Sequence, residues 1–135
     1  MRGLPGWAVR CAALLLVLAV GAVWAAPSQA GDAAESAPAA IPVPGMVTLV
    51  DLGANRCIPC KLMAPVLNEV REEYRGRAAV VFLDVWEDPN LTDRFGIQVI
   101  PTQIFYDAKG REALRHEGFM DKAAIAKVFA RLGVE

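Results

Sequence analysis

The chain of 135 residues has few of the side chains on which metal centres and nucleic-acid interfaces depend. It contains three cysteines and a single histidine, His116, and one of those cysteines, Cys11, lies within a hydrophobic N-terminal run. A structural zinc site needs four ligands, so we expect no metal. The 14 basic and 15 acidic side chains nearly cancel, which argues against a nucleic-acid partner because such proteins usually carry a basic stripe.

Charged side chains are also scarce in the first 45 residues, which hold only Arg2, Arg10, Asp32 and Glu35. An uncharged apolar run of 16 residues, 11–26, follows the two arginines. A basic start followed by such a run is typical of an export signal. Its length lies between the about 7–15 residues of a signal-peptide core and the about 17–25 residues of a membrane-spanning helix.

We therefore expect residues 1–30 to be a signal peptide, cleaved after Ala30, or a membrane anchor. In both cases the rest of the chain would be exported to a bacterial periplasm, either soluble or tethered to the inner membrane. Residues 31–45 are rich in Ala, Pro, Ser and Gly, which predicts a flexible linker. Residues 46–135 carry most of the charges and predict one small globular domain.

The domain begins with a strand–helix–strand pattern. Apolar, β-branched runs at 46–52 and 78–85 predict two buried strands, and joining them through a helix makes them a parallel pair. Pro65 should kink that helix and Gly76 should end it. Apolar residues recur every four positions along this helix and predict its buried face. They are Leu62, Val66, Val70 and Tyr74, flanked by Met63 and Leu67.

A hairpin and a last helix complete the domain. Residues 102–106 and 112–117 predict two antiparallel strands joined by a turn at 107–110. Asp121 is a favourable N-cap for the helix that follows. The sequence thus predicts an α/β domain in which helices flank a mixed four-stranded sheet.

Two cysteines, Cys57 and Cys60, lie between the first predicted strand and the first predicted helix, separated by Ile58 and Pro59. The free N–H groups and the dipole at a helix N-terminus favour a thiolate, which makes the first cysteine a nucleophile. The second cysteine, one turn away, can attack the resulting mixed disulfide. Dithiol redox chemistry is the favoured interpretation, with zinc binding and a purely structural disulfide as alternatives.

Four features of the sequence bear on its family. In chain order they are Asp51 six residues before Cys57, the Cys-Ile-Pro-Cys-Lys segment with Ala64-Pro65 after it, Ile100-Pro101-Thr102, and Gly118 after the last strand. Together they resemble the thioredoxin family, over about residues 47–132. The resemblance implies a thioredoxin fold, a cis-proline loop at Pro101, and protein thiols and disulfides as substrates. It also implies that no cofactor is bound, because the sulfurs of Cys57 and Cys60 carry the electrons.

Several positions depart from the family pattern. Arg56 stands where the family usually has a tryptophan, and Ile58 where it usually has a glycine. Gly53 replaces an aromatic ring two residues after the buried acid, and Phe82 takes the place of a lysine that faces the acid. No periodic segment between residues 30 and 46 corresponds to the family's first strand and helix, so we expect a minimal thioredoxin fold that lacks both.

The resemblance implies a role for each site residue. Cys57 would be the attacking nucleophile, Cys60 the resolving thiol and Asp51 a buried proton acceptor for Cys60 through water. Desolvation should raise the pKa of Asp51, because Phe82 supplies no compensating cation. Arg56 and Lys61 would modulate the cysteines, since the charge of Arg56 favours the thiolate. The predicted substrate-binding residues are Ile58, Pro59, Ile100, Pro101 and Gly118, with Phe119 completing an apolar rim.

The sequence as a whole predicts an exported, monomeric thiol–disulfide oxidoreductase with a membrane or periplasmic redox partner. One alternative is a redox-inert peptide-binding or chaperone-like module on the same fold. Another is a dedicated reductant in cytochrome or copper-site assembly. The direction of electron flow does not follow from these residues, because it depends on the relative stability of the thiolates.

Overall fold

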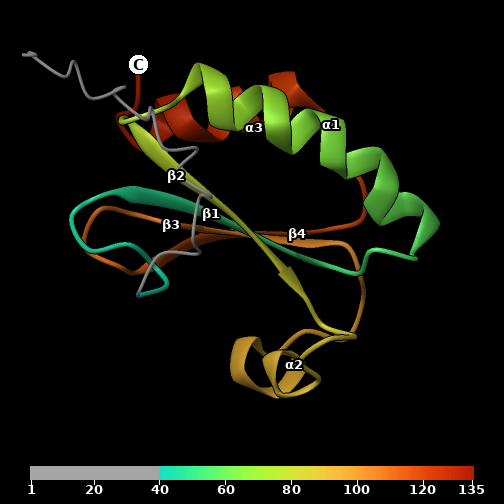
Figure 1. Ribbon diagram of the computed structural model, residues 1–135. Coiled ribbons are helices and arrows are strands. Elements are labelled where there is room, and N and C mark those ends of the chain that lie inside the picture. The colour runs from blue at the N-terminus through green and yellow to red at the C-terminus, as the bar shows by residue number, and fades with distance from the viewer. Residues whose placement is uncertain (1–39) are drawn as a thin grey trace, which may run out of the picture. The chain divides into compact units, whose positions relative to one another are not determined.

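The described part of the chain, residues 40–135 of the computed structural model, alternates strands and helices (Figure 1). These residues belong to one unit that extends from Glu35 to Glu135. No helix within 40–135 is both long and apolar enough to cross a membrane. The predicted signal peptide or anchor at 1–30 lies outside the described residues. In chain order the elements are β1 (Val47–Gly53), α1 (Ile58–Glu73), β2 (Ala78–Asp84), α2 (Asn90–Phe95), β3 (Thr102–Tyr106), β4 (Glu112–Glu117) and α3 (Lys122–Arg131).

The strands form one mixed sheet in the order β2-β1-β3-β4. β1 runs parallel to β2, and β3 is antiparallel to both β1 and β4. A parallel pair requires a crossover connection, which α1 provides. The predicted α/β domain, a mixed four-stranded sheet with flanking helices, is therefore confirmed. The predicted absence of a strand and helix before β1 concerns residues 30–46, most of which lie outside the described part.

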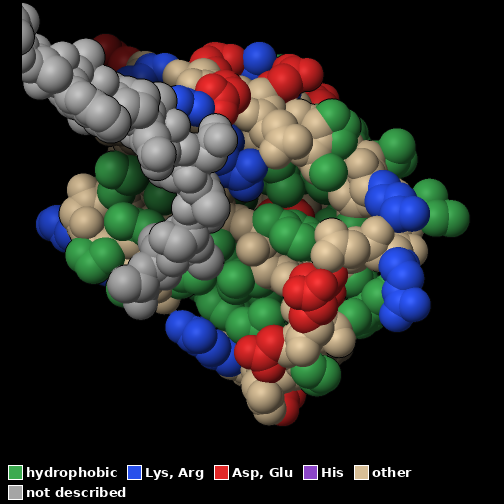
Figure 2. Space-filling model, viewed as in Figure 1, with side chains coloured by type: hydrophobic (Ala, Val, Ile, Leu, Met, Phe, Trp, Pro, Cys, Tyr) green, Lys and Arg blue, Asp and Glu red, His purple; other side chains and the backbone are tan. Residues whose placement is uncertain are grey.

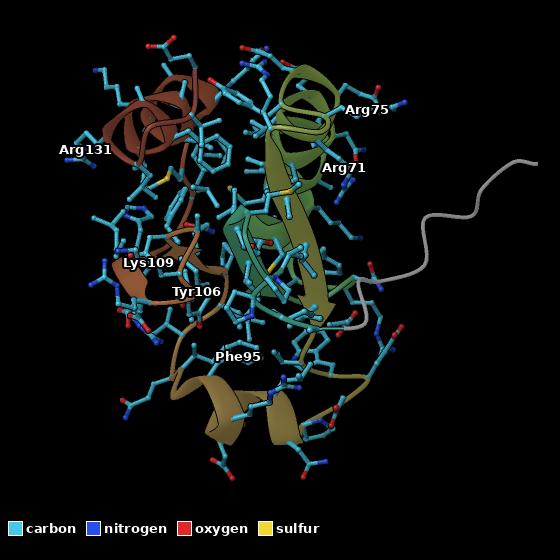
Figure 3. All side chains as sticks on the ribbon, turned by 90° about the vertical axis from the view of Figure 1, so that its left-hand side faces the viewer. Arg71, Arg75, Phe95, Tyr106, Lys109 and Arg131 are labelled. Carbon is cyan, nitrogen blue, oxygen red and sulfur yellow. A yellow bond between two sulfur atoms is a disulfide. The ribbon has the colours of Figure 1, made fainter. Side chains whose placement is uncertain are left out.

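The helices cover the two faces of the sheet unequally. α1 and α3 lie side by side on one face and α2 lies on the other (Figure 1 and Figure 3). Because side chains alternate along a strand, Leu49 of β1 joins the core under α1 and α3 while Val50 joins the core over α2. In the larger core, Phe129 of α3 packs edge-on against Tyr74 and Phe105, with ring centroids 4.8 and 5.9 Å apart.

The burial of α1 corrects one detail of the predicted helix. Met63, Leu67 and Val70 face the core, but Leu62 is 59% exposed, so its predicted place on the buried face is wrong. Successive residues of a helix point in directions about 100° apart, so a side chain next to Met63 need not share its face. Pro65 lies inside the helix, as the sequence indicates.

Residues 40–46 lead into β1. Ile41 packs against the core on the α2 side of the sheet. The Val43 N–H donates a hydrogen bond to Thr48 Oγ1 at 3.1 Å. These residues come from the end of the segment that the sequence predicts as a linker.

The end of β1, the start of β3, the end of β4 and the start of α1 lie together at one end of the sheet. Leu52, near the end of β1, pairs with Thr102 at the start of β3, and Thr102 pairs with Glu117 at the end of β4. β1 then passes through a short loop into α1. This topology brings the cysteine segment, the Pro101 loop and Gly118 to the same end of the sheet.

Candidate active site

The two domain cysteines form a disulfide at the N-terminus of α1. The Cα atoms of Cys57 and Cys60 are 5.2 Å apart. Cys57 is the N-cap residue, and its Sγ accepts a hydrogen bond from the Cys60 N–H at 3.3 Å. Cys57 is half-buried, whereas Cys60 is only 4% exposed. An external sulfur can therefore reach Cys57 more easily than Cys60.

Cys60 packs against the end of β1. A Cβ atom built on Gly53 would lie 3.3 Å from Cys60 Sγ and 3.1 Å from Cε2 of Phe82. Leu52 pairs with Thr102 in the antiparallel ladder, so Pro101 lies opposite Gly53 one step further on. The disulfide, the glycine and the proline loop thus adjoin one another.

The loop at Pro101 is tied to the segment after β4. The Ile100–Pro101 peptide bond is cis, and Pro101 is buried. The Gly118 N–H donates to the Pro101 carbonyl oxygen at 2.8 Å. Two residues later, the Met120 N–H lies 3.3 Å from Sδ of Met63 on α1. The Gly118 segment therefore bridges the proline loop and the helix that carries the cysteines.

Asp51 lies two residues before Gly53, on the same face of β1, and is completely buried. Burial raises the pKa of Asp51 to about 6, and a hydrogen bond from Gln103 opposes this rise. The Gln103 Nε2 donates to Asp51 Oδ1 at 2.7 Å. On the other side, the register partner of Asp51 is Phe82, which carries no charge. An ionisable carboxyl group with a pKa of about 6 therefore lies two residues from the glycine that Cys60 contacts.

Arg56, next to Cys57, lies over the ring of Trp86, with its Cζ 6.0 Å from the ring centroid. Asp84 joins the two loops that carry these side chains: it accepts the N–H of Asn55 at 2.9 Å and that of Trp86 at 2.8 Å. Desolvation alone would raise the Asp84 pKa, but the hydrogen bonds from Asn55, Trp86 and Glu87 and the charge of Arg56 hold it below its usual value. The loop before Cys57 is thus held from β2.

A pocket of about 180 Å³ opens beside Cys60, on the side where α1 passes Phe82. Lys61 and Ala64 of α1 also line it. Lys61 is exposed, and its modulating role stays a prediction. Within residues 40–135, no group of three or more His, Cys, Asp and Glu side chains could hold a metal ion.

Exposed apolar side chains lie on the three segments that form the site: the start of α1, the Pro101 loop and the Gly118 segment. Ile58 is 77% exposed, and Val99 and Phe119 are also exposed. Figure 2 shows hydrophobic side chains next to Lys and Arg at the right-hand edge, where Figure 1 places the start of α1. Pro59 is exposed beside Ile58, whereas Ile100 is half-buried and packs toward the α2 side of the sheet.

Three residues of this region carry no role in the sequence prediction: Gln103, Asp84 and Trp86. Gln103 lies in a predicted strand, but its partner Asp51 is 52 residues away, so only the strand register reveals the contact. Asp84 lies near the end of a predicted strand. Its contact with the loop before Cys57 depends on the pairing of β2 with β1, which the sequence does not show. The aromatic Trp86 at a strand end was the one available signal of a surface role.

A disulfide at the accessible N-terminus of a helix, next to a buried acid and a cis-proline loop, defines a protein that exchanges thiols and disulfides. The Thioredoxin family model matches residues 39–131. The thioredoxin of Staphylococcus saprophyticus is 39% identical over 85 residues, covering 63% of this chain and 81% of that protein. A Staphylococcus aureus thioredoxin is 39% identical over 82 residues, covering 61% and 78%.

Solved structures give the same result. A chloroplastic thioredoxin z matches with a TM-score of 0.60 and 36% identity, covering 67% of this chain and 81% of that one. The pneumococcal exposed lipoprotein thioredoxin Etrx1 of Streptococcus pneumoniae matches with a TM-score of 0.59 and 21% identity, covering 64% and 85%, which shows a shared fold.

The chain belongs to the thioredoxin family. It is a thiol–disulfide oxidoreductase, and the family acts on protein disulfides. Thioredoxins need no cofactor, because the redox-active disulfide is part of the protein itself.

Proposed function

We propose that the protein is an exported oxidoreductase in which Cys57 attacks disulfides of protein substrates and Cys60 resolves the mixed disulfide. The difference in burial between the two sulfurs carries this assignment. Cys57 is half-buried at the N-terminus of α1, where backbone N–H groups stabilise a thiolate, while Cys60 is 4% exposed. The first attack therefore belongs to Cys57.

The reaction conserves sulfur bonds and electrons. In the direction of substrate reduction, the Cys57 thiolate forms a bond to one substrate sulfur and the other substrate sulfur leaves as a thiolate. Cys60 then gives up its proton, and its thiolate attacks Cys57 Sγ, which releases the second substrate sulfur. The substrate disulfide is reduced to two thiols and the Cys57–Cys60 dithiol is oxidised to a disulfide; in the reverse direction the same steps oxidise a substrate dithiol.

Asp51 is the acceptor that we propose for the Cys60 proton. It is fully buried on the face of β1 that Cys60 contacts at Gly53, and burial raises its pKa to about 6. A general base is most effective when its pKa lies near the working pH, because it is then both ionised and able to hold a proton. Asp51→Asn should slow the resolution step near neutral pH.

The substrate would bind as an extended segment across the disulfide. We assign its contacts to Ile58, Pro59, the Ile100–Pro101 backbone and Gly118. Gly118 and Pro101 are joined by a 2.8 Å hydrogen bond, which fixes the two segments beside each other. An extended peptide can add main-chain hydrogen bonds there, while exposed apolar side chains such as Ile58 contact its side chains.

Turbidity of insulin during reduction by dithiothreitol tests the proposed activity. The wild-type chain should accelerate precipitation of the insulin B chain, and Cys57→Ser should abolish the acceleration. Cys60→Ser should turn over poorly, because its mixed disulfide has no internal thiol to resolve it. Equal rates for the wild type and Cys57→Ser would instead support a redox-inert binding module.

Export and a membrane-side redox partner remain proposals that rest on the sequence. The basic start and the 16-residue apolar run at 11–26 support an N-terminal export signal or anchor, and hence a periplasmic location. Fusion of residues 1–45 to alkaline phosphatase, which is active only after export, tests this. Activity should depend on the apolar run, and an inactive fusion would remove the proposal.

We also propose that the protein is a monomer. Size-exclusion chromatography of residues 40–135 should give the mass of a single copy.

A further inference from the structure

A row of four paired side chains crosses the sheet beneath α1. In register, Phe82 of β2 pairs with Asp51 of β1, Asp51 with Gln103 of β3, and Gln103 with His116 of β4. Residues opposite one another in paired strands project to the same face, here the face on which Gly53 meets Cys60. The two central members of the row are polar in an otherwise apolar layer.

The contact between these two residues divides the Asp51 carboxyl group into two unlike oxygens. Gln103 Nε2 donates to Oδ1 at 2.7 Å, and both residues are fully buried. Oδ2 is buried and accepts no hydrogen bond from the protein within the described residues, and the same holds for Gln103 Oε1. The amide group therefore holds one oxygen of the acid and leaves the other without a protein donor.

Charged groups around the row do not replace this contact. On β2 the partner of Asp51 is the uncharged Phe82, and from α1 Cys60 lies against Gly53, two residues after Asp51 on the same strand face. Lys61 and Arg71 of α1 line the pocket beside Cys60 and Phe82. On β4, His116 lies beyond Gln103, and its Nε2 is 3.2 Å from the Phe119 carbonyl oxygen.

We propose that Gln103 is a positioning residue for proton transfer: its amide holds Oδ1 of Asp51, so that Oδ2 exchanges the proton with the Cys60 thiol, and it stabilises the carboxylate, whose partner on β2 is the uncharged Phe82. This inference rests on the proposed role of Asp51 as the proton acceptor. The proton of the Cys60 thiol moves to Oδ2, and the sulfur electron pair forms the bond to Cys57. The substrate sulfur leaves Cys57 as a thiolate.

The pH dependence of the resolution step tests the inference in Gln103→Leu. The reduced protein is mixed with dithio-bis-nitrobenzoate, and release of the second thionitrobenzoate reports attack of Cys60 on Cys57. The lost hydrogen bond stabilises the charged form of Asp51, so the midpoint of the resolution profile should move up by about one to two pH units. At pH 6 the variant should resolve about fivefold to fiftyfold more slowly, with the wild-type rate recovered at high pH. An unchanged midpoint would overturn the inference.

Two variants separate the possible causes of a shift. His116→Asn replaces the side chain on the other side of Gln103, so it serves as the matched control and should leave the midpoint in place. In an Asp51→Asn background, Gln103→Leu should produce no further change in the profile. A further change there would show that Gln103 acts on folding or on Cys60 directly, and would contradict the inference.

The proposed function and this inference fail differently. If Asp51→Asn resolves at the wild-type rate, the role of Asp51 is wrong and the inference falls with it. If Asp51→Asn is slow and Gln103→Leu keeps the wild-type midpoint, only the role of Gln103 is wrong. If Gln103→Leu does not fold, nuclear magnetic resonance of the wild type decides. The chemical shifts of the Gln103 side-chain amide and of the Asp51 carboxyl carbon should then change with pH at one common midpoint. An amide chemical shift that does not change with pH would contradict the inference.

Discussion

Gly53 and Cys60 are in such close contact that even a methyl group on the strand would press on the resolving cysteine. A Cβ atom on Gly53 would lie 3.3 Å from both Sγ and Cβ of Cys60 and 3.1 Å from the Phe82 ring. These separations are shorter than ordinary van der Waals contact. Phe82, on the neighbouring strand, thus supplies the aromatic packing next to Cys60, at the position where the family pattern predicts a lysine.

Gly53→Ala should therefore destabilise the oxidised protein. The added methyl group must displace the Phe82 ring or Cys60, and such overpacking costs about 1–3 kcal/mol. Urea unfolding at pH 7 measures the change. In a Phe82→Leu background the ring no longer occupies the site, so the same substitution should cost less. An equal cost in both backgrounds would contradict the packing described for this pair.

Asp51 should make the stability of the oxidised protein depend on pH between about 4 and 6. Its pKa is raised from 3.8 to about 6 in the folded state, so within this window the folded state binds more protons than the unfolded state. The free energy of unfolding should therefore fall as pH rises through the window, by about 3 kcal/mol in total. Asp51→Asn should lack this fall and be more stable than the wild type at pH 8.

Urea unfolding of both proteins at pH 4 and pH 8 checks this expectation. Asn at position 51 keeps an acceptor for Gln103, so the comparison isolates the charge. The two proteins should have similar stability at pH 4 and diverge as pH rises. Parallel profiles would mean that Asp51 ionises as it does in the unfolded chain, and would remove it as a candidate base.

Arg56 should increase the reactivity of Cys57 toward alkylating agents. Its charge lies next to the N-cap cysteine, and the guanidinium group rests over Trp86, near enough to Asp84 to lower the pKa of that carboxyl group. The pH midpoint of iodoacetamide labelling of reduced Cys57 should lie below the value of about 8.5 for a free cysteine. Arg56→Gln should move this midpoint upward.

Lys109→Gln provides the matched control, because it removes the same charge from the exposed turn after β3, far along the chain from the cysteines (Figure 3). It should leave the labelling midpoint of Cys57 unchanged. If the two substitutions have the same effect, the arginine acts only through net charge. If neither moves the midpoint, Arg56 does not modulate the cysteine.

Strand bounds, turns and helix caps could be predicted from the sequence, because each depends on a local pattern of residues. The predicted strands at 102–106 and 112–117 have the observed bounds, and Asp121 caps α3 by accepting the Ala124 N–H at 2.7 Å. These features depend on residues close together in the chain, such as turn glycines, caps and alternating apolar residues. Gly110 adopts a φ of +78° in the turn between β3 and β4, as the sequence indicates.

Features that depend on strand register could not be predicted in the same way. A glutamine in an apolar strand gives no sign of which buried group it contacts, and Gln103 finds Asp51 only because β3 lies beside β1. The exposure of Leu62 likewise depends on how α1 is rotated over the sheet. Trp86 contacts Arg56 only because two loops converge at the ends of β1 and β2.

Intact-mass analysis of Cys60→Ser and Cys57→Ser, each in a Cys11→Ser background that leaves one cysteine, after incubation with insulin tests the central claim most directly. Cys60→Ser should form a covalent adduct with an insulin chain through Cys57, and dithiothreitol should release it. Cys57→Ser, which retains only the buried Cys60, should form little or none. Adducts of equal yield in both variants, or an adduct only through Cys60, would contradict the assignment of Cys57 as the attacking sulfur.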